Sequence, residues 1–458
     1  MWRCCLPILV SLSIPLGSAA GDEPGEPIGP ADAVRLALEH NPRLLAADAG
    51  LRAAEADRRA ASASGLPRIE FTEDWVRSNN PVFVFSSKLL QGVFATDDFA
   101  IDVLNEPEPI TNSTARLSIY QSIWNGRNSP EKKTAVAGVA VAESSQRKAR
   151  DEVVFTTLEA YWALASARRM MEVTADGVAA AEANLALARE LVDAGLAVPS
   201  DRLAAEVRLA DVRATSVRAE YGVEVAHAAL LRALGEDRPE MRYVPIETDR
   251  LPELGDDSLE RRTEQAMLGR ADLAELDRRI EQARIGARSA RAGRYPEIGA
   301  AGSYEWNGER LLAADGENWA VGLALRMTIF DGHRTDARVQ RAAAELAQLE
   351  AMRVALAQGV RLEVASAWAE RESAARRLEL AATALEQAGE VMRIVRERYG
   401  EGVALVVELL SAEAALTAAQ AQQVVAVGEL WLADAGLDLA SGTDPIPDLP
   451  SVTTGGPG

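Results

Sequence analysis

The sequence predicts a mainly α-helical protein with a small β part, in which one helix and strand unit occurs twice. The 458 residues include 85 alanines but only 5% aromatic residues, and alanine is the strongest helix former. Similar segments recur in the second half of the chain, and several short stretches alternate apolar and polar residues as strands do. These features argue against a mainly β or α/β enzyme. The formal net charge of −20 argues against a nucleic-acid partner, which would need a basic surface.

Residues 1–20 are typical of a secretory signal peptide. Arg3 precedes an apolar run over 6–16, and small residues follow it over 17–20. Both cysteines of the chain, Cys4 and Cys5, lie in this segment. We therefore expect an exported protein without disulfides or a thiolate metal site. Because the cysteines precede the apolar run, we expect no acyl anchor.

An internal repeat divides the chain. Three pairs of segments match in the same order: 37–67 with 266–296, 123–127 with 329–333, and 195–206 with 402–413. Each copy indicates a helix, two strands and a very long helix that turns back. We expect the elements in this order: helices 31–64 and 259–293, β-hairpins 68–124 and 297–330, and helical hairpins 127–234 and 333–440. The first repeat is predicted over 21–234, a linker over 235–258, the second repeat over 259–440, and a disordered tail over 441–458.

The long helices, predicted over 127–194 and 333–400, carry a heptad pattern. At 1.5 Å per residue each would be about 100 Å long. Large residues recur every seven positions, with smaller ones three positions later: Met171, Val178, Leu185 and Val192 with Thr174, Ala181 and Ala188; Leu378, Leu385, Met392 and Tyr399 with Ala381, Ala388 and Val395. An ordinary amphipathic helix is the alternative for either copy alone. The recurrence in both copies favours coiled-coil packing.

The predicted strands are long enough to cross a bilayer. Residues 319–330 place Trp319, Val321 and Leu323 on one face and small or polar residues on the other. A tilted membrane strand needs about 9 to 11 residues. A half-buried sheet of a soluble protein is the alternative. Beyond residue 20 no run of 18 apolar residues occurs, so a membrane crossing would need strands. Four strands per chain cannot close a barrel, so several copies would have to share one.

These features together resemble the TolC family of outer-membrane efflux proteins. The resemblance rests on the signal peptide, the duplicated unit, the Pro67 and Pro296 breaks before the strands, and the Gly-containing hairpin tips. It covers residues 31–440. It implies a homotrimer with a 12-stranded β-barrel, formed from four transmembrane strands per chain, and a tunnel of 12 helices. An equatorial region would come from 235–258 and the stretch after Trp431.

The resemblance also implies a constriction at the periplasmic tips. By position, Tyr399 matches the family's tip tyrosine, Glu408 an aperture carboxylate, and Asp201 the acidic tip position of the other hairpin. The second aperture carboxylate is replaced by Ser411 and the tip arginine by Ala404. These two replacements weaken the expectation that the pore is closed by the same bonds that close it in the family. For Glu408 alone, a solvated helix face is the alternative.

The turns of the two hairpins resemble the tips that dock a periplasmic adaptor protein in the family. They contain Gly195 and Leu196 in the first copy, and Gly402 and Val403 in the second. The resemblance therefore implies an adaptor, an inner-membrane pump and outer-membrane lipid as partners. The protein would lie in the outer membrane with a long periplasmic extension.

The sequence contains no recognisable catalytic motif. Its three histidines, His40, His227 and His333, are far apart, so we expect no metal site, no cofactor and no enzyme activity. The leading hypothesis is a passive exit duct of a tripartite efflux or type I secretion system. A soluble periplasmic coiled-coil adaptor or scaffold is the alternative. The longer first loop, 79–113, is expected to face the exterior and either to plug the barrel or to cover it.

Overall fold

The computed structural model describes residues 25–126, 128–246, 251–252 and 257–444. The predicted signal peptide and most of the predicted tail lie outside these residues. The chain divides into two compact units, which we describe separately. The hairpin unit comprises Met1–Leu36, Thr157–Leu251 and Leu380–Gly428, and the sheet unit comprises Ala37–Thr156, Pro252–Glu379 and Glu429–Gly458.

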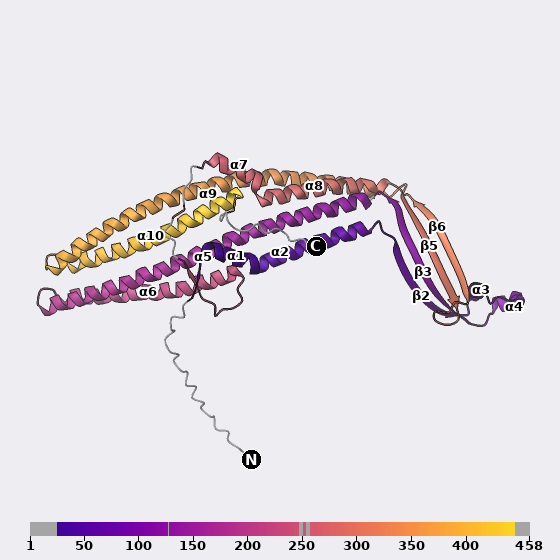
Figure 1. Cartoon of the computed structure of the whole chain (residues 1–458), viewed down its shortest axis with the longest axis horizontal. Helices are drawn as coiled ribbons and strands as arrows, with labels where there is room; N and C mark the ends of the chain where they lie inside the picture. Colours follow the sequence, from indigo (N-terminus) through magenta and orange to yellow (C-terminus); the bar gives the residue numbers. More distant parts are fainter. Residues whose placement is uncertain (1–24, 127, 247–250, 253–256, 445–458) are drawn as a thin grey trace, which may run out of the picture. The chain divides into compact units, whose positions relative to one another are not determined.

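Helices dominate the structure, as the sequence predicts (Figure 1). The two longest, α5 and α9, contain 66 and 67 residues. The helices other than those of the first loop are α1 Pro30–His40, α2 Pro42–Ala63, α5 Asn128–Asp193, α6 Pro199–Leu234, α7 Leu259–Gly269, α8 Ala271–Arg291, α9 Arg334–Gly400 and α10 Val406–Ser441. Among the described residues, none of the helices combines the length and apolar character that a membrane crossing requires.

The first helix of each copy is broken, so the prediction of continuous helices over 31–64 and 259–293 was wrong. Asn41 separates α1 from α2 and has an extended backbone with ψ of 124°. A proline disfavours the helical conformation of the residue before it, and Pro42 follows. The Asn41 side chain then accepts a hydrogen bond from the Arg43 N–H at 2.9 Å, which caps the new helix. Arg270 separates α7 from α8 and also has an extended backbone, with ψ of 127°, but Ala271 follows it and its side chain makes no capping hydrogen bond.

The sheet unit contains one antiparallel sheet with the strand order β2-β3-β5-β6. Its strands are β2 Arg68–Ser78, β3 Ile110–Asn125, β5 Glu297–Gly308 and β6 Gly316–Arg326, so β2 and β6 form the edges. One face carries exposed apolar side chains: Ile69, Phe71, Trp75, Leu117, Ile119, Trp319, Val321, Leu323 and Leu325. The opposite face is polar and includes an ion pair between Arg116 Nε and Glu305 Oε1 at 2.9 Å.

Helices occupy much of the loop predicted over 79–113. The segment contains α3 Pro81–Leu90, the 3-10 helix η1 Thr96–Phe99 and α4 Ile101–Asn105. Asn80 caps α3, because its side-chain oxygen accepts hydrogen bonds from the N–H groups of Val82 and Phe83. The end of the predicted loop, from Ile110, already belongs to β3.

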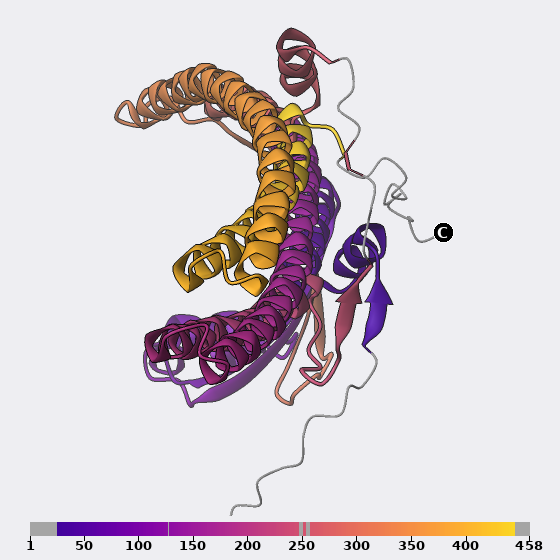
Figure 2. The ribbon, with the colours of Figure 1, turned by 90° about the vertical axis from the view of Figure 1, so that its left-hand side faces the viewer.

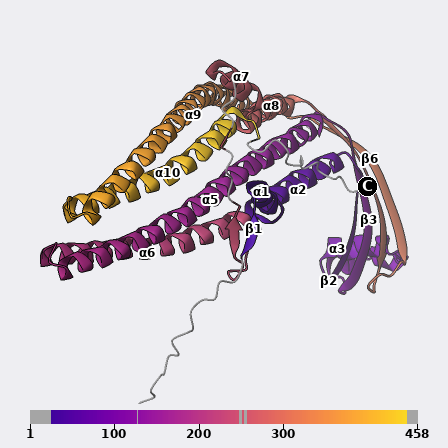
Figure 3. The same ribbon diagram turned by 60° about the vertical axis from the view of Figure 1, so that its left-hand side comes forward.

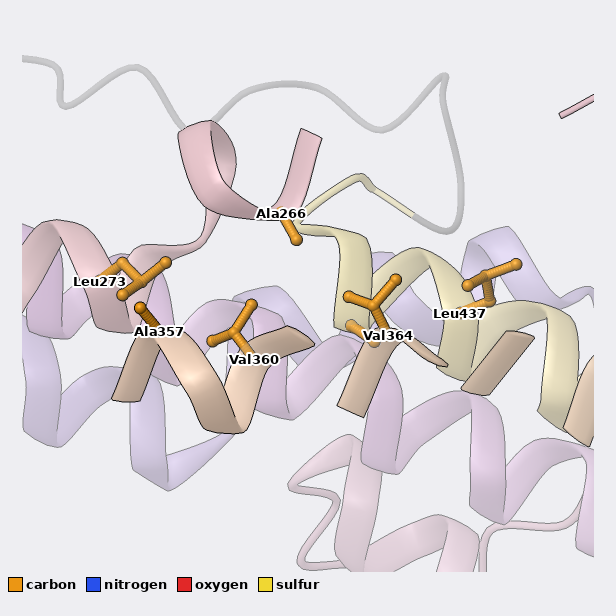
Figure 4. Close-up of a cluster of buried hydrophobic side chains, with 7 residues drawn as sticks. Ala266, Leu273, Ala357, Val360, Val364 and Leu437 are labelled. Carbon is orange, nitrogen blue, oxygen red and sulfur yellow. The ribbon is translucent and has the colours of Figure 1, made fainter. Parts of the chain in front are cut away.

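The sheet unit also has a core of small and aliphatic side chains between helices (Figure 4). Seven buried residues from α7, α8, α9 and α10 form it: Ala266, Leu273, Ala357, Val360, Val364, Leu437 and Ala440. Alanine and valine bring helix backbones close together, which explains the high alanine content of the chain.

A two-stranded parallel sheet lies in the hairpin unit, where β1 Glu26–Ile28 pairs with β4 Tyr243–Pro245 (Figure 2). The fully buried Tyr161 of α5 donates its hydroxyl hydrogen to the carbonyl oxygens of Ile28 and Ile246, both at 3.2 Å. His227 of α6 accepts the Tyr243 N–H at Nε2, at 3.2 Å, and burial lowers the pKa of this histidine. The sequence analysis did not predict β1.

The Tyr161→Phe substitution should destabilise the hairpin unit by about 1 to 2 kcal/mol, because it removes a donor shared by the buried Ile28 carbonyl and the part-buried Ile246 carbonyl. Thermal unfolding followed by circular dichroism would measure the loss. Tyr221→Phe is the matched control, since Tyr221 of α6 is 70% exposed and should tolerate the change. Equal losses of stability in the two variants would contradict a stabilising role for the Tyr161 hydrogen bonds.

Candidate functional site at the hairpin tips

The hairpin unit contains the ends of two antiparallel helix pairs, α5 with α6 and α9 with α10 (Figure 3). The predicted heptad positions Val178, Ala181 and Leu185 of α5 pack against α6 in one hydrophobic cluster. At the tip, Gly195 has φ of +72°. Its N–H donates to the Val192 carbonyl at 3.0 Å, and the Leu196 N–H donates to the Leu191 carbonyl at 2.8 Å.

The second tip repeats this geometry. Gly402 has φ of +74°, its N–H donates to the Tyr399 carbonyl at 3.0 Å, and the Val403 N–H donates to the Arg398 carbonyl at 2.9 Å. A left-handed glycine with these two hydrogen bonds is the Schellman ending of a helix. The Gly-containing tips noted in the sequence therefore both end a long helix with a left-handed glycine.

Apolar side chains project from both tips. Six of them are each more than half exposed: Leu196, Val198, Leu203, Val403, Leu405 and Val407. A cluster of exposed apolar residues on a folded protein is typical of a docking surface. We call these six residues the apolar tips.

The two candidate acidic residues occupy equivalent positions just after the turns. The Asp201 N–H donates to the Val198 carbonyl at 2.9 Å, and the Glu408 N–H donates to the Leu405 carbonyl at 3.0 Å. A carboxylate in the first turn of a helix also interacts favourably with the helix dipole. Glu408 is exposed, and Arg398 Nη1 lies 3.9 Å from its carboxylate. Ser411, also exposed, lies one turn further along α10.

Tyr399 is almost completely buried, at 3% exposure. It packs with Met392 of α9 and Leu409 of α10, and Leu187 and Leu191 of the other hairpin contact the same cluster. Its hydroxyl is buried and has no hydrogen-bond partner among the described residues. Burial, together with the nearby charge of Asp201, raises the pKa of Tyr399. The structure thus places Tyr399 inside the contact between the hairpins and Glu408 outside it.

A buried polar network joins the two hairpins beside this cluster. Glu413 of α10 is 2% exposed. It accepts hydrogen bonds from the Asn184 side chain of α5 and, at 3.4 Å, from Arg208 Nε of α6. Asn184 is also buried, at 3% exposure. A buried carboxylate with partners on two other helices fixes the positions of all three.

The sequence analysis did not select Asn184, Arg208 or Glu413. It aligned Glu413 only with its repeat counterpart Glu206. The structure separates these two residues, because the Glu206 side chain is 36% exposed and meets Arg189 at 3.3 Å within its own hairpin. Heptad spacing cannot distinguish a buried inter-hairpin carboxylate from a surface one.

The tips offer carboxylates and apolar surface rather than reaction chemistry. No group of three or more His, Cys, Asp or Glu residues able to hold a metal occurs in the part of the chain that the structure describes. The arrangement can fix two helical hairpins against each other, expose apolar residues at their ends and present charge near the turn.

A model of the outer membrane efflux protein family matches residues 33–236 and 263–443, which include both copies of the repeat. The chain belongs to this family. It is therefore an outer-membrane protein, and the resemblance drawn from the sequence is confirmed. The gap between the two matched segments contains β4.

Similarities to individual proteins are consistent with this family membership. Outer membrane protein OprJ of Pseudomonas aeruginosa is 26% identical over 293 residues, a match that covers 63% of this chain and 60% of OprJ. The chain thus matches less than two thirds of that relative's length. The outer membrane channel CmeC of Campylobacter jejuni superposes with a TM-score of 0.78 at 16% identity, over 90% of this chain and 85% of CmeC. The outer membrane protein VceC of Vibrio cholerae gives 0.73 at 20% identity, over 90% and 96%. CmeC and VceC therefore have the same fold as this chain.

Proposed function

We propose that this efflux protein is the outer-membrane exit duct of a tripartite efflux or type I secretion system, and that three copies form it. The observation that carries the proposal is the four-stranded sheet, which has an exposed apolar face and a polar opposite face. Such a sheet matches the wall of a membrane barrel, with apolar residues toward lipid and polar residues toward the lumen.

The edges of the sheet support an assembly of several copies. Within one chain, β2 and β6 are the two edge strands, and an open strand edge in lipid leaves backbone groups without hydrogen bonds. Pairing β6 of one copy with β2 of the next would remove both edges. Three copies would give a 12-stranded barrel, and their helical hairpins would form the tunnel.

The apolar tips suit contacts with a periplasmic adaptor that connects the duct to an inner-membrane pump. Gly195 with Leu196, and Gly402 with Val403, form the outermost turns, and the two exposed apolar side chains there would meet the adaptor. The pump would supply the energy, and the duct would be passive. Drugs, metal ions and proteins are the substrate classes for such a duct.

We further propose that the tips form the constriction of the duct. Around a three-fold axis, three Glu408 side chains would form a ring, which attracts cations and narrows the passage. Ser411 lies on the same helix one turn away, and Asp201 occupies the equivalent position of the other hairpin. Tyr399 would hold the ends of the two hairpins together, since it is buried among residues of both.

Removing the Glu408 charge should raise single-channel conductance in planar bilayers and weaken block by divalent cations. Glu408→Gln is the test variant, and Glu408→Asp, which keeps the charge, is the control. The Gln variant should change both quantities because the ring would lose its negative charge. The Asp variant keeps the charge and should stay close to the wild type. Equal behaviour of the two variants would reject the aperture role.

The duct itself is tested by fractionation and mass measurement. We expect the native protein in the outer-membrane fraction and, after detergent extraction, as a complex of three chains by light scattering. Recovery as a soluble monomer would instead favour the adaptor or scaffold alternative.

A further inference from the structure

The helical segment between β2 and β3 is attached to one particular face of the sheet. This segment, Pro81–Asn105, includes α3, η1 and α4 and lies at the end of the strands (Figure 1). We call it the loop domain. Because β2 starts just after α2, the loop domain lies at the opposite end of β2 from that helix.

Gln91 at the end of α3 anchors the loop domain. It is 2% exposed, and its Nε2 donates to the Thr111 carbonyl and to Asn112 Oδ1, both at 2.8 Å. The Asn112 Nδ2 donates in turn to Asn307 Oδ1 on β5, at 3.1 Å. Asn307 is completely buried. The anchor therefore joins the loop domain to two neighbouring strands.

The register of the sheet shows which face holds this anchor. Asn112 lies four residues before Arg116 on β3, and Asn307 lies two residues after Glu305 on β5. Side chains two or four positions apart on a strand point to the same face. The Gln91 anchor is therefore on the polar face, which contains the Arg116–Glu305 ion pair, and not on the apolar one.

Gly316 of β6 shows the same placement independently. It pairs with Asn307, and a Cβ added to it would collide with the carbonyl group of Leu90 at the end of α3. Only glycine leaves room for the backbone of α3 here. The end of α3 thus rests directly on the polar face at the β6 edge.

Two opposite sides of α3 differ in burial. Val84, Ser87 and Gln91, which recur at helical spacing, are buried. Val82 and Leu89 lie seven residues apart on the other side and are 77% and 52% exposed, and Ile101 of α4 is 77% exposed. One side of α3 is thus buried, while the other leaves apolar side chains exposed.

Internal contacts make the loop domain a folded element. The rings of Phe85 and Phe94 are 5.0 Å apart, and those of Phe94 and Phe99 are 5.1 Å apart, both edge to face. Lys88 Nζ and Asp98 Oδ1 form an ion pair at 2.6 Å. These contacts connect α3 with η1, so the segment can keep its shape across the polar face.

We propose that the loop domain plugs the outer mouth of the duct, and that Val82, Leu89 and Ile101 of one copy pack against the same surface of its neighbours. The proposal rests on the trimeric duct proposed above. In that assembly the polar face lines the lumen, so an element anchored to it lies inside the mouth. A barrel of about 8 strands is filled by side chains, whereas one of 16 leaves a channel. A 12-stranded barrel would leave space that three loop domains can occupy.

A second copy is the occupant that fits the exposed apolar side chains. Lipid would contact the opposite face of the sheet, where Val321 and Leu323 are exposed. Apolar residues inside an aqueous mouth are stabilised only by burial against another apolar surface. The three-fold arrangement supplies that surface, because each loop domain would face its two symmetry mates.

The first test pushes the end of α3 off the sheet. Gly316→Ala should displace α3 and raise single-channel conductance by roughly twofold or more, since the mouth would widen. Gly322→Ala is the control: Gly322 lies on the same strand and the same face, and no atom lies within 4 Å of a Cβ added there. Replacing residues 81–107 by a short turn should give the same increase without strain in β6. Unchanged conductance in both variants would overturn the plug.

The second test locates the apolar contact. Both cysteines lie within residues 1–20, so single cysteines can be introduced in the rest of the chain. Oxidation of Val82→Cys in native membranes should give disulfide-linked dimers. Val321→Cys should remain monomeric, although Val321 is similarly exposed, at 78% against 77% for Val82. A trimer by light scattering that gives no dimers at Val82 would overturn the contact and leave the duct intact, whereas a monomer would reject the duct itself.

Discussion

Leu323→Arg should remove most of the protein from the outer membrane. Leu323 lies in the middle of β6 and is 77% exposed on the apolar face of the sheet. An arginine on the lipid face of a barrel costs about 2 to 4 kcal/mol at the bilayer midplane. Because each copy of the proposed trimer carries the change, the cost is incurred three times in one barrel. Quantitative blotting of membrane fractions would measure the loss.

The control for this variant is Ala320→Arg. Ala320 lies on the same strand, three residues earlier, and faces the polar side opposite Ser303. An arginine there would enter the lumen and should leave the amount in the membrane nearly unchanged. Equal depletion by the two variants would show that the sheet does not separate lipid from water, and the duct proposal would lose its main support.

Glu413→Ala should destabilise the contact between the hairpins by about 3 kcal/mol, because removing one partner leaves buried groups unpaired. Asn184 would lose the acceptor for its buried amide. Arg208 keeps some contact with water, since its side chain is 20% exposed, so the cost should fall at the low end of the range for buried pairs. Thermal unfolding of the purified protein in detergent would measure it.

Glu206→Ala is the matched control, because Glu206 is the counterpart of Glu413 in the first copy. Its ion pair with Arg189 is largely solvated, and such pairs contribute about 0 to 1 kcal/mol. We also expect Glu413→Ala, but not Glu206→Ala, to increase the frequency of channel opening in bilayers. Equal effects on stability would show that the buried network does not hold the hairpins.

The repeat and its periodicities account for what the sequence predicted well. The heptad spacing predicted that Val178 and Leu185 lie on a packing face of their helix, and both belong to the cluster between α5 and α6. A helix face is determined by residue spacing alone. The glycines at the tips marked the turns for a similar local reason, because only glycine adopts the left-handed ending easily. The alternation of β6 likewise identified its apolar face.

Contacts between distant segments could not be predicted in this way. Gln91 meets Asn307 through Asn112 across more than 200 positions of chain, and nothing in their local sequence indicates that the three share one network. The burial of Glu413 could not be predicted either, because its repeat counterpart Glu206 has the same sequence spacing but a side chain that is 36% exposed. The three-residue strand β1 is too short to show any periodicity.

The two edge strands also have a consequence for the way the protein matures. A lone chain ends its sheet at β2 and β6, so in the proposed trimer the hydrogen bonds between β6 of one copy and β2 of the next would form only when chains associate. Completion of the fold should therefore speed up as more chains are supplied and stall when they are scarce. Before the chains associate, the unpaired edges of β2 and β6 would favour aggregation. Newly made chains should therefore need chaperones that keep them apart.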